Sequence, residues 1–371
     1  MPRIDAFLKL GLAQGCSDIH LAVGVPPMLR MNGDLMPIKF RQLEDTELES
    51  YVMEILTDSQ KEFFYAGQDL DFSYVTEESN GRFRVNLFHK ATGVGAVFRY
   101  IPNEVPTLEQ LGMPEIIRTF CDYHQGMVLV TGSTGTGKST TLAAMIDHLN
   151  STRELNIISL EDPIEFVHQS KRSQVIQREL GTHLNSFADG VRSAMREDPD
   201  VILVGELRDA ETISMAMTAA ETGHLVLGTL HTTGAVKTID RIVDALPGEL
   251  REQTKSFLAQ SLKAVVTQVL VKMPEGQGRK AIMEILINNR AISKLIMSDQ
   301  NHQIPSQLQT GRDAGMKLMD QALFEAVEAK EIDPDDAVRH ALDKARFQPF
   351  VSDLSILPVF DEPSKESSQH E

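Results

Sequence analysis

A glycine-rich segment near the middle of the chain has the residue types needed to hold a phosphate chain. It consists of Gly132, Ser133, Thr134, Gly135, Thr136, Gly137, Lys138, Ser139 and Thr140. The segment fits the pattern GxxxxGK[ST] and lies between an apolar strand-like run and a helix-like run, the context in which this pattern forms a phosphate-binding loop. Its glycines let backbone N–H groups turn inward around an anion, and the helix adds its positive dipole end. We therefore expect Lys138 to reach the β and γ phosphates of ATP and the Ser139 hydroxyl to bind Mg²⁺.

Acidic residues follow two other apolar runs. Glu206 follows the run 201–204 and is expected to hold the magnesium ion through water, although an acid at the end of a strand can also be an ordinary solvated residue. Glu161 and Glu165 follow the run 157–160, at the sheet edge where open α/β sheets bind their ligands. A carboxylate there could orient or deprotonate the water that attacks the γ-phosphate, or could simply cap the next helix.

The histidines and arginines each allow two interpretations. His224 and His231 flank a further apolar run, and because side chains alternate across a strand, we do not expect these two to share a metal ion. His231 is either a hydrogen-bonded structural residue or a sensor of the γ-phosphate. Arg82, Arg84 and Arg99 alternate with apolar residues, so they are either solvent-facing residues of a pleat or arginines that reach a neighbouring subunit's ATP.

Periodicity divides the chain into two parts, of which the first is expected to be a small α+β domain over residues 1–100. Helical spacing occurs at residues 4–14 and 43–66, and strand character at 18–23, 28–31, 70–75, 82–89 and 93–100. The turn residues Asn32, Gly33 and Asp34 predict a hairpin. A proline-containing linker is expected over residues 101–112.

The second part alternates apolar strands with helices, which predicts an α/β domain. Strands are expected at 127–131, 156–160, 201–204 and 225–228, with helices at 140–149 and after about 288. This order is typical of a mostly parallel sheet covered on both faces. We assign residues 113–347 to this domain and 348–371 to a polar, disordered tail.

Composition narrows the possible partners and location. The net charge of −17 disfavours nucleic acid, which is bound by clustered Lys and Arg. Cys16 and Cys121 lie far apart without CxxC spacing, so we expect neither a disulfide framework nor zinc. No run approaches the roughly 20 apolar residues of a membrane span. We therefore expect a cytoplasmic protein that meets a membrane only through partners.

Four ordered segments resemble those of a known family. The segments GSTGTGKST, ISLEDPIEFVH, AMREDPDVILVGELRD and AAETGHLVLGTLHTT are similar to the Walker A motif, Asp box, Walker B motif and His box of secretion-type ATPases, in the form seen in the PilT/PilU pilus-retraction ATPases. The likeness covers most of residues 1–345. By motif position it implies the Walker B acid Glu206, the catalytic acid Glu165 with Glu161 in reserve, the His-box residue His231 and the intersubunit arginines Arg82, Arg84 and Arg99.

The resemblance also implies an architecture and an activity. Family members join a PAS-like N-terminal domain to a RecA-like P-loop ATPase domain with a helical C-terminal end. They form homo-hexamers in which the N-terminal domain of one subunit packs on the nucleotide domain of the next. ATP turnover returns pilin subunits to the inner membrane, so an inner-membrane pilus platform protein is the implied partner.

The subtype stays open within this family. With two cysteines the chain has no four-cysteine zinc insert of the kind found in pilus-extension and type II secretion ATPases, which favours retraction over assembly. PilT proteins typically carry an AIRNLIRE-like helix, whereas residues 291–298 read AISKLIMS and lack both arginines and the acid. The extended C-terminal tail is similar to that of PilU, so an accessory ATPase that depends on a paralogue is the alternative.

Overall fold

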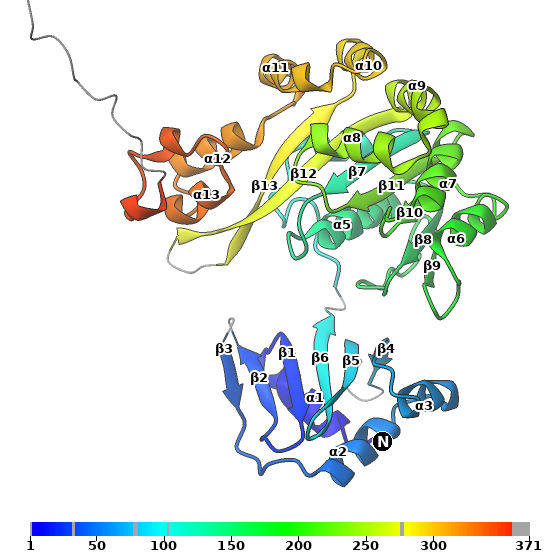
Figure 1. The fold of residues 1–371 in the computed structure, drawn as a ribbon, viewed down its shortest axis with the longest axis vertical. Helices are drawn as coiled ribbons and strands as arrows, with labels where there is room; N and C mark the ends of the chain where they lie inside the picture. Colours follow the sequence, from blue (N-terminus) through cyan, green and yellow to red (C-terminus); the bar gives the residue numbers. More distant parts are fainter. Residues whose placement is uncertain (1, 32–33, 77–80, 102–103, 275–277, 358–371) are drawn as a thin grey trace, which may run out of the picture. The chain divides into compact units, whose positions relative to one another are not determined.

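The structure, a computed structural model, separates into two units. It describes residues 2–31, 34–76, 81–101, 104–274 and 278–357 (Figure 1). One unit comprises Met1–Val105, Glu161–Gln169 and Gln177–His183. The other comprises Pro106–Leu160, Ser170–Ile176 and Leu184–Glu371.

A six-stranded antiparallel sheet forms the N-terminal unit. Its strands are β1 (Asp18–Ala22), β2 (Met28–Met31), β3 (Asp34–Pro37), β4 (Leu70–Val75), β5 (Arg82–Lys90) and β6 (Gly93–Ile101). They lie in the order β3-β2-β1-β6-β5-β4. The strands expected from sequence are therefore present, and β2 pairs with β3 as the hairpin interpretation requires. The predicted turn residues Asn32 and Gly33 lie outside the described residues.

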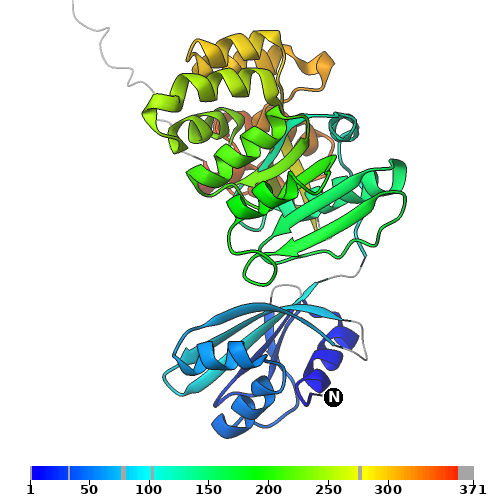
Figure 2. The same cartoon turned by 90° about the vertical axis from the view of Figure 1, so that its right-hand side faces the viewer.

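Three helices complete this unit and share one core with the sheet (Figure 2). They are α1 (Asp5–Gln14), α2 (Asp45–Met53) and α3 (Asp58–Tyr65). Leu8, Leu48 and Phe64 from the helices are fully or almost fully buried in a cluster with Phe83 and Val85 of β5. Burial of each such side chain contributes about 1.5–3 kcal/mol. Because side chains alternate along β5, this packing turns the arginines of the same strand toward the opposite face of the sheet.

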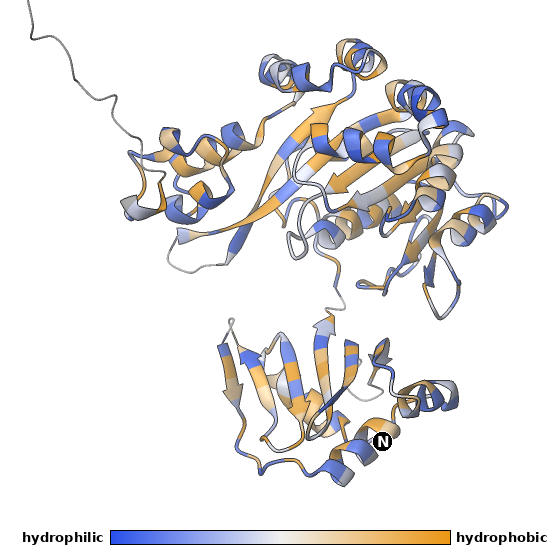
Figure 3. Cartoon of the chain, in the orientation of Figure 1, coloured by the Kyte–Doolittle hydropathy of each residue, from blue (hydrophilic) through white to orange (hydrophobic). Residues whose placement is uncertain are grey.

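A seven-stranded sheet forms the centre of the second part of the fold. Its strands are β7 (Gly126–Thr131), β8 (Asn156–Glu161), β9 (Gln174–Glu179), β10 (Val201–Val204), β11 (Leu225–Leu230), β12 (Leu262–Lys272) and β13 (Arg279–Ile287). They lie in the order β13-β12-β7-β11-β10-β8-β9, and the pairings from β12 to β8 are parallel. Strands β7, β10 and β11 are buried at every residue, which explains their predominantly apolar sequences (Figure 3).

Strands β9, β12 and β13 belong to this sheet but were not expected from the sequence. The 11-residue β12 and the 9-residue β13 pair as an antiparallel hairpin along their whole common length. Strand β12 also pairs with β7 up to the pair Thr267–Thr131 and then continues beyond the end of β7. The residues of β12 that follow Thr267 are thereby carried past the point where β7 gives way to the glycine-rich loop.

Helices surround this sheet and extend the unit at its C-terminal end (Figure 1). They are α4 (Ile116–Cys121), α5 (Lys138–Thr152), α6 (Phe187–Ala194), α7 (Ala210–Glu221), α8 (Ala235–Ala245), α9 (Arg251–Ser261), α10 (Arg290–Met297), α11 (Ile304–Thr310), α12 (Met319–Glu328) and α13 (Pro334–His340). Leu142 and Ile146 of α5 join the core formed with β7. The C-terminal helices α12 and α13 form a separate cluster with Val271 of β12 and Ile282 of β13.

The segment assigned to a polar tail begins with packed residues. Val351, Ile356 and Leu357 lie against the cluster of α12 and α13, and a short 3-10 helix spans Leu354–Ile356. Residues 358–371 lie outside the described part of the chain. Among the residues that are described, no helix is long and apolar enough to cross a membrane.

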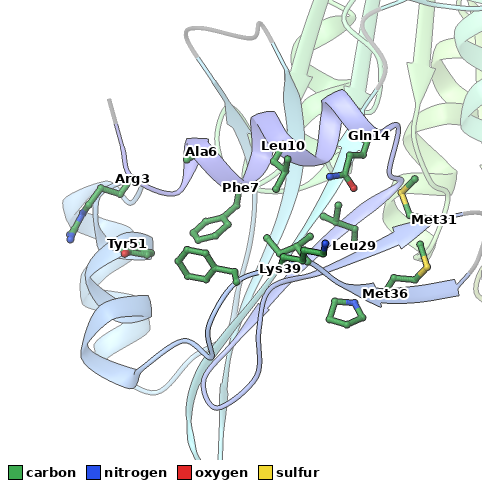
Figure 4. Close-up of a pocket in the computed structure, with 13 residues that line it drawn as sticks. Arg3, Ala6, Phe7, Leu10, Gln14, Leu29, Met31, Met36, Lys39 and Tyr51 are labelled. Carbon is green, nitrogen blue, oxygen red and sulfur yellow. The ribbon is translucent and has the colours of Figure 1, made fainter.

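An apolar groove of about 730 Å³ lies in the N-terminal unit between α1 and the β2–β3 hairpin (Figure 4). Phe7 and Leu10 line it from α1, and Met36 lines it from β3, with Lys39 beside them. The groove contains neither the glycine-rich loop nor any of the acids expected to take part in catalysis. The candidate catalytic residues are therefore identified by their types and geometry and not by this groove.

Candidate nucleotide site

The glycine-rich loop connects the end of β7 to the beginning of α5, as the sequence pattern predicts. Strand β7 ends at Thr131 and helix α5 begins at Lys138. Gly137 precedes the helix with φ of 85°, a left-handed conformation that glycine adopts without steric cost. The first N–H groups of the 15-residue helix α5 therefore border the loop, and together with its dipole they favour an anion there.

Lys138 is folded onto the carbonyl groups of its own loop. Its Nζ donates to the carbonyl oxygens of Gly132 at 2.8 Å and Ser133 at 2.9 Å, and the residue is 8% exposed. A buried ammonium group needs such partners because an uncompensated buried charge is very costly. Phosphate oxygens are stronger, charged acceptors, so a bound triphosphate can take over this role from the two carbonyls.

Glu206 comes two residues after β10 and is held between two basic side chains. Its Oε2 lies 2.7 Å from Nε of Arg208, and its Oε1 lies 3.1 Å from Nε2 of His231. Burial raises the pKa of Glu206, but the hydrogen bond and charge of Arg208, followed by His231, outweigh burial and bring the pKa below its usual value. Glu206 is therefore kept as a carboxylate, the form needed to hold a magnesium ion or its water ligands.

Thr229 of β11 fixes the backbone on both sides of Glu206. Its hydroxyl donates to the carbonyl of Gly205 at 2.5 Å, and its carbonyl accepts the N–H of Leu207 at 3.0 Å. The end of β10 is thus tied to the strand that leads directly to His231. Of the two histidines, His231 contacts the acid, whereas Nδ1 of His224 lies 2.8 Å from the carbonyl of Ala219 at the other end of β11.

The two candidate bases of the Asp box have different surroundings. Glu161 is the last residue of β8, and its Oε1 accepts a hydrogen bond from Nε2 of Gln177 at 3.0 Å. Glu165 lies in the loop that follows and is half-buried. The backbone of this loop is fixed by Glu179 of β9, whose Oε2 accepts the N–H of Ile164 at 3.0 Å. Glu161 is therefore engaged by a neighbouring side chain, while Glu165 follows a backbone position that is held in place.

Arg82 meets Glu179 within the N-terminal unit. The distance from its Nη2 to Oε2 of Glu179 is 3.5 Å, and the same nitrogen donates to the hydroxyl of Ser73 at 3.3 Å. Ser73 also donates to Glu179 at 3.1 Å. Both charged side chains are largely buried, with 17% and 9% of the arginine and glutamate side chains exposed. Of the three arginines, Arg82 is the one most enclosed by its own chain.

Arg84 and Arg99 stand directly opposite each other on β5 and β6. Nη2 of Arg84 lies 2.7 Å from Oδ2 of Asp71, and Nε of Arg99 lies 2.8 Å from Oδ1 of Asp18. The hydrogen bond to Asp71 raises the pKa of Arg84, and the charges of Asp71, Asp162 and Glu165 add to this against a smaller opposing effect of burial. Like charges placed directly across a sheet repel. Asp71 and Asp18 offset this repulsion between the two arginines.

The residues present fit a magnesium ion that is completed by water and phosphate. Ser139 is half-buried at the start of α5, and Glu206 is a carboxylate, so the chain offers two oxygen ligands of the kind magnesium prefers. Magnesium at nucleotide sites usually keeps several waters and binds substrate phosphates in addition. In the described part of the chain, no group of three or more His, Cys, Asp or Glu side chains could hold a metal by itself.

Comparison with known proteins places the chain in a family. A family model described as Type II/IV secretion system protein matches residues 2–333. The chain belongs to this family. It is 49% identical to the type IV pilus retractation ATPase PilT of Pseudomonas aeruginosa over 320 residues, which cover 86% of this chain and 92% of that protein. It is 38% identical to the type IV pilus ATPase PilU of the same organism over 339 residues, covering 91% and 88% of the two chains.

Solved structures agree with this family membership. The crystal structure of the pilus retraction motor PilT with bound ADP has a TM-score of 0.87 and 38% identity, over 94% of this chain and 99% of that one. The ATPase DotB of Legionella pneumophila has a TM-score of 0.77 and 31% identity, over 90% and 94% of the two chains. This family member is therefore a nucleotide-binding ATPase, with an N-terminal domain and an ATPase domain as in PilT.

Three residues of the site were missed in the sequence. Arg208 follows Glu206 by two residues, so a basic residue just after the strand was a signal for an ion pair. Thr229 lies inside the His box, and Gln268 lies on β12, 132 residues along the chain from the loop residue Thr136 that it contacts. No local pattern marks Gln268, because its importance depends on a strand pairing that was not predicted.

Proposed function

We propose that this chain is a hexameric, magnesium-dependent motor ATPase that drives the retraction of type IV pili. The observation that supports the proposal best is the near full-length correspondence with PilT, which extends through both domains. An ATPase that shared only the phosphate loop would resemble PilT in the nucleotide domain alone. Here the arginine-bearing sheet of the N-terminal domain corresponds as well, and that sheet has no use in a single isolated nucleotide site.

In this proposal the loop residues 132–140 bind the phosphates of ATP. Lys138 leaves the two carbonyls of its loop and pairs with the β and γ phosphates. Ser139 and Glu206 hold Mg²⁺, with Glu206 acting mainly through bound water. Transfer of the γ-phosphoryl group to water needs little covalent chemistry from the protein, so positioning and charge stabilisation account for most of the rate.

Glu165 is the proposed base that orients or deprotonates the attacking water, with Glu161 as the alternative. Glu161 already accepts a hydrogen bond from Gln177, whereas the loop that carries Glu165 is fixed at the neighbouring Ile164. His231 is proposed to report the presence of the γ-phosphate through its contact with Glu206. This contact gives it a direct route to the magnesium site.

Arg82, Arg84 and Arg99 are proposed to act on the ATP of a neighbouring subunit. In a ring this makes hydrolysis in one subunit depend on the position of the next, which is what a motor requires. Their acidic partners must then be exchanged for phosphate oxygens, and an exposed pair such as Arg84–Asp71 is weak enough to exchange. The ring is proposed to work in the cytoplasm against an inner-membrane platform protein of the pilus machinery, with no role for nucleic acid or zinc.

The decisive experiment measures ATP turnover, ring formation and retraction with one set of variants. Purified wild-type protein is expected to hydrolyse ATP as a hexamer, measured by phosphate release and light scattering. In cells that lack their own retraction ATPase, it should restore shortening of fluorescently labelled pili. Glu206→Gln should reduce turnover severely and abolish retraction, whereas Glu211→Gln, a change to an exposed acid paired with Arg192, should do neither. Turnover without retraction would refute the pilus role while leaving the ATPase intact.

A PilU-like accessory ATPase is the second candidate, and helix α10 is the observation that favours it. This helix buries Ile292 and Ile296. Its residues Ser293 and Lys294 stand where the AIRNLIRE-like helix of PilT proteins typically carries arginine and asparagine. The accessory form predicts retraction only in cells that also contain a paralogous retraction ATPase. Retraction with this chain as the sole such ATPase excludes it.

A further inference from the structure

The continuation of β12 beyond β7 brings Gln268 against the phosphate loop. Thr267 pairs with Thr131, the last residue of β7, and Gln268 is the next residue along β12. Gln268 is 1% exposed although its side chain is a polar carboxamide. A buried carboxamide is costly unless its hydrogen-bonding groups find partners, so the partners of Gln268 are informative.

Both polar atoms of the Gln268 carboxamide form hydrogen bonds, one with the loop and one with the helix that follows it. Nε2 donates to the carbonyl of Thr136 at 2.6 Å. Oε1 accepts from the hydroxyl of Thr141, in the first turn of α5, at 2.8 Å. Thr141 is itself 1% exposed, so water does not compete for this bond. One side chain thus connects the C-terminal part of the loop, at Thr136, to helix α5.

The loop also lies so close to Gln268 that two of its glycines have no room for a side chain. A Cβ atom on Gly132 would lie 2.4 Å from the Gln268 carbonyl oxygen, and one on Gly137 would lie 2.9 Å from Nε2. The first of these distances involves backbone and cannot be relieved by a side-chain rotation. The phosphate loop therefore packs closely against strand β12 at both Gly132 and Gly137.

The hydrogen bond to Thr136 has a consequence for phosphate binding. In a trans peptide the C=O and the N–H of the same plane point in opposite directions. When Gln268 fixes the Thr136 carbonyl toward β12, the N–H of Gly137 is directed away from β12. Phosphate loops bind anions with backbone N–H groups of this kind.

We propose that Gln268 is a positioning residue of the nucleotide site, which holds the phosphate loop in its anion-binding conformation. Its Nε2 orients the Thr136–Gly137 peptide, and its Oε1 keeps that peptide in register with the first turn of α5. Gln268 touches neither phosphate nor magnesium and acts through the loop. The inference rests on the assignment of residues 132–140 to the nucleotide phosphates.

The test compares substitutions that keep the volume of the side chain but change its hydrogen bonding. Gln268→Met removes both bonds, and Gln268→Glu keeps an acceptor for Thr141 but loses the donor to Thr136. Affinity for a fluorescent ADP analogue is measured by titration, turnover by phosphate release, and folding by thermal melting of the full-length protein. We expect both variants to bind nucleotide about 10- to 100-fold more weakly, because each lost buried hydrogen bond leaves a partner unsatisfied. Gln268→Glu should be the weaker binder, since its charge adds repulsion toward the phosphates of the nucleotide.

A control variant and a coupling measurement separate positioning from general stability. Asn288→Leu removes a carboxamide just after β13 that donates to three backbone carbonyls at the end of α9 and the start of β12, away from the loop. It should lower the melting temperature without changing nucleotide affinity. Thr141→Val should weaken binding in the wild-type background but add little to Gln268→Met, because both act on one contact, whereas Thr141→Ser should restore binding.

Each outcome bears on the proposal. Loss of affinity in folded Gln268→Met and Gln268→Glu, with non-additivity toward Thr141→Val, supports it. Affinity within twofold of wild type in both folded variants, or equal losses in Asn288→Leu, overturns it while the phosphate loop keeps its role. Failure of the wild-type protein to bind nucleotide would overturn the site assignment and this inference together.

Discussion

The phosphate loop and the arginine-bearing face of the N-terminal sheet are held in opposite ways. In the loop, Lys138 and the backbone are fastened by carbonyl groups and by the buried carboxamide of Gln268. On the sheet, Arg82, Arg84 and Arg99 are each paired with a carboxylate of their own chain. To bind a nucleotide, Lys138 exchanges two neutral carbonyl groups for phosphate oxygens. The arginines must instead give up a charged partner.

The difference matches the two tasks that a ring motor has to perform. Binding ATP is done by one subunit, so its site can be prepared in advance by contacts inside that subunit. Sensing a neighbour's ATP requires groups that change partners as subunits move. Exposed ion pairs contribute about 0–1 kcal/mol each, so exchange of Asp71 for a triphosphate at Arg84 has little to overcome.

Lys138→Ala should have the largest effect, since it removes the cation of the prepared site. We expect ATP affinity and turnover each to fall by at least about 100-fold, the scale seen when one fixed charge-stabilising donor is removed. Titration with a fluorescent nucleotide and phosphate release measure the two quantities. Lys171→Ala, which breaks an exposed pair with Asp147, is the matched control. Tight ATP binding by Lys138→Ala would contradict the loop assignment.

Glu206→Gln should separate binding from turnover. The amide cannot supply the negative charge that magnesium and its water require, so we expect turnover to fall about 100-fold while ATP affinity stays within a few fold of wild type. Because the pKa of Glu206 is held below its usual value, the wild-type carboxylate should stay charged, and active in this respect, on acidification to its ordinary pKa. Normal turnover in Glu206→Gln would rule out its proposed place at the magnesium site.

Arg84→Ala should have a smaller effect, and one that another subunit can repair. We expect a loss of about tenfold in turnover, less than for a lone arginine finger because Arg82 and Arg99 remain. ATP affinity should be almost unchanged. Mixed with inactive Lys138→Ala subunits, Arg84→Ala subunits should regain activity, because one partner supplies the arginine and the other an intact phosphate loop. Mixed rings that stay as slow as the separate variants would refute action between subunits.

Sequence predicts the loop better than the arginines for the same physical reason. The run from Gly132 to Ser139 acts through its own backbone and through the strand and helix beside it, all of which are local in the chain. The partners of Arg84 and Arg99 come from β4 and β1, so the ion pairs depend on strand register. The alternation of side chains shows that both face away from the core, but it does not show which acids they meet.

Strands β12 and β13 mark the limit of prediction within the nucleotide domain. Residues 262–272 form a run rich in Val and Leu, and such a run fits a buried strand and a buried helix equally well. The pairing of β12 with β7 joins segments more than a hundred residues apart, and this pairing places Gln268 beside Thr136. Because β13 was not predicted either, nothing in the sequence indicated that Glu284 on this strand contacts the starts of two helices.

The smallest effect is expected at Glu284. Like the phosphate loop, this residue is held by contacts within the nucleotide domain, but it takes no part in the proposed hydrolysis. Its Oε1 accepts the N–H of Ala235 at the start of α8 at 2.8 Å, and its Oε2 accepts that of Met319 at the start of α12 at 3.3 Å. Burial raises the pKa of Glu284 above its ordinary value, with a smaller contribution from the charge of Asp320, and the two backbone hydrogen bonds only partly oppose this.

The sign of the resulting pH dependence follows from the raised pKa. The folded state holds the proton of Glu284 more tightly than the unfolded state does, so its stabilising contribution is complete below the ordinary pKa and is lost as pH rises through the raised value. Glu284→Gln does not titrate and keeps one acceptor. Relative to wild type, this variant should therefore gain stability from pH 4.5 upward, by no more than about 1 kcal/mol because a hydrogen bond to the carboxylate is also lost. Urea unfolding of both proteins measures the difference, and a difference that is constant or falls with pH would show that the contacts with α8 and α12, and not burial, determine the charge of Glu284.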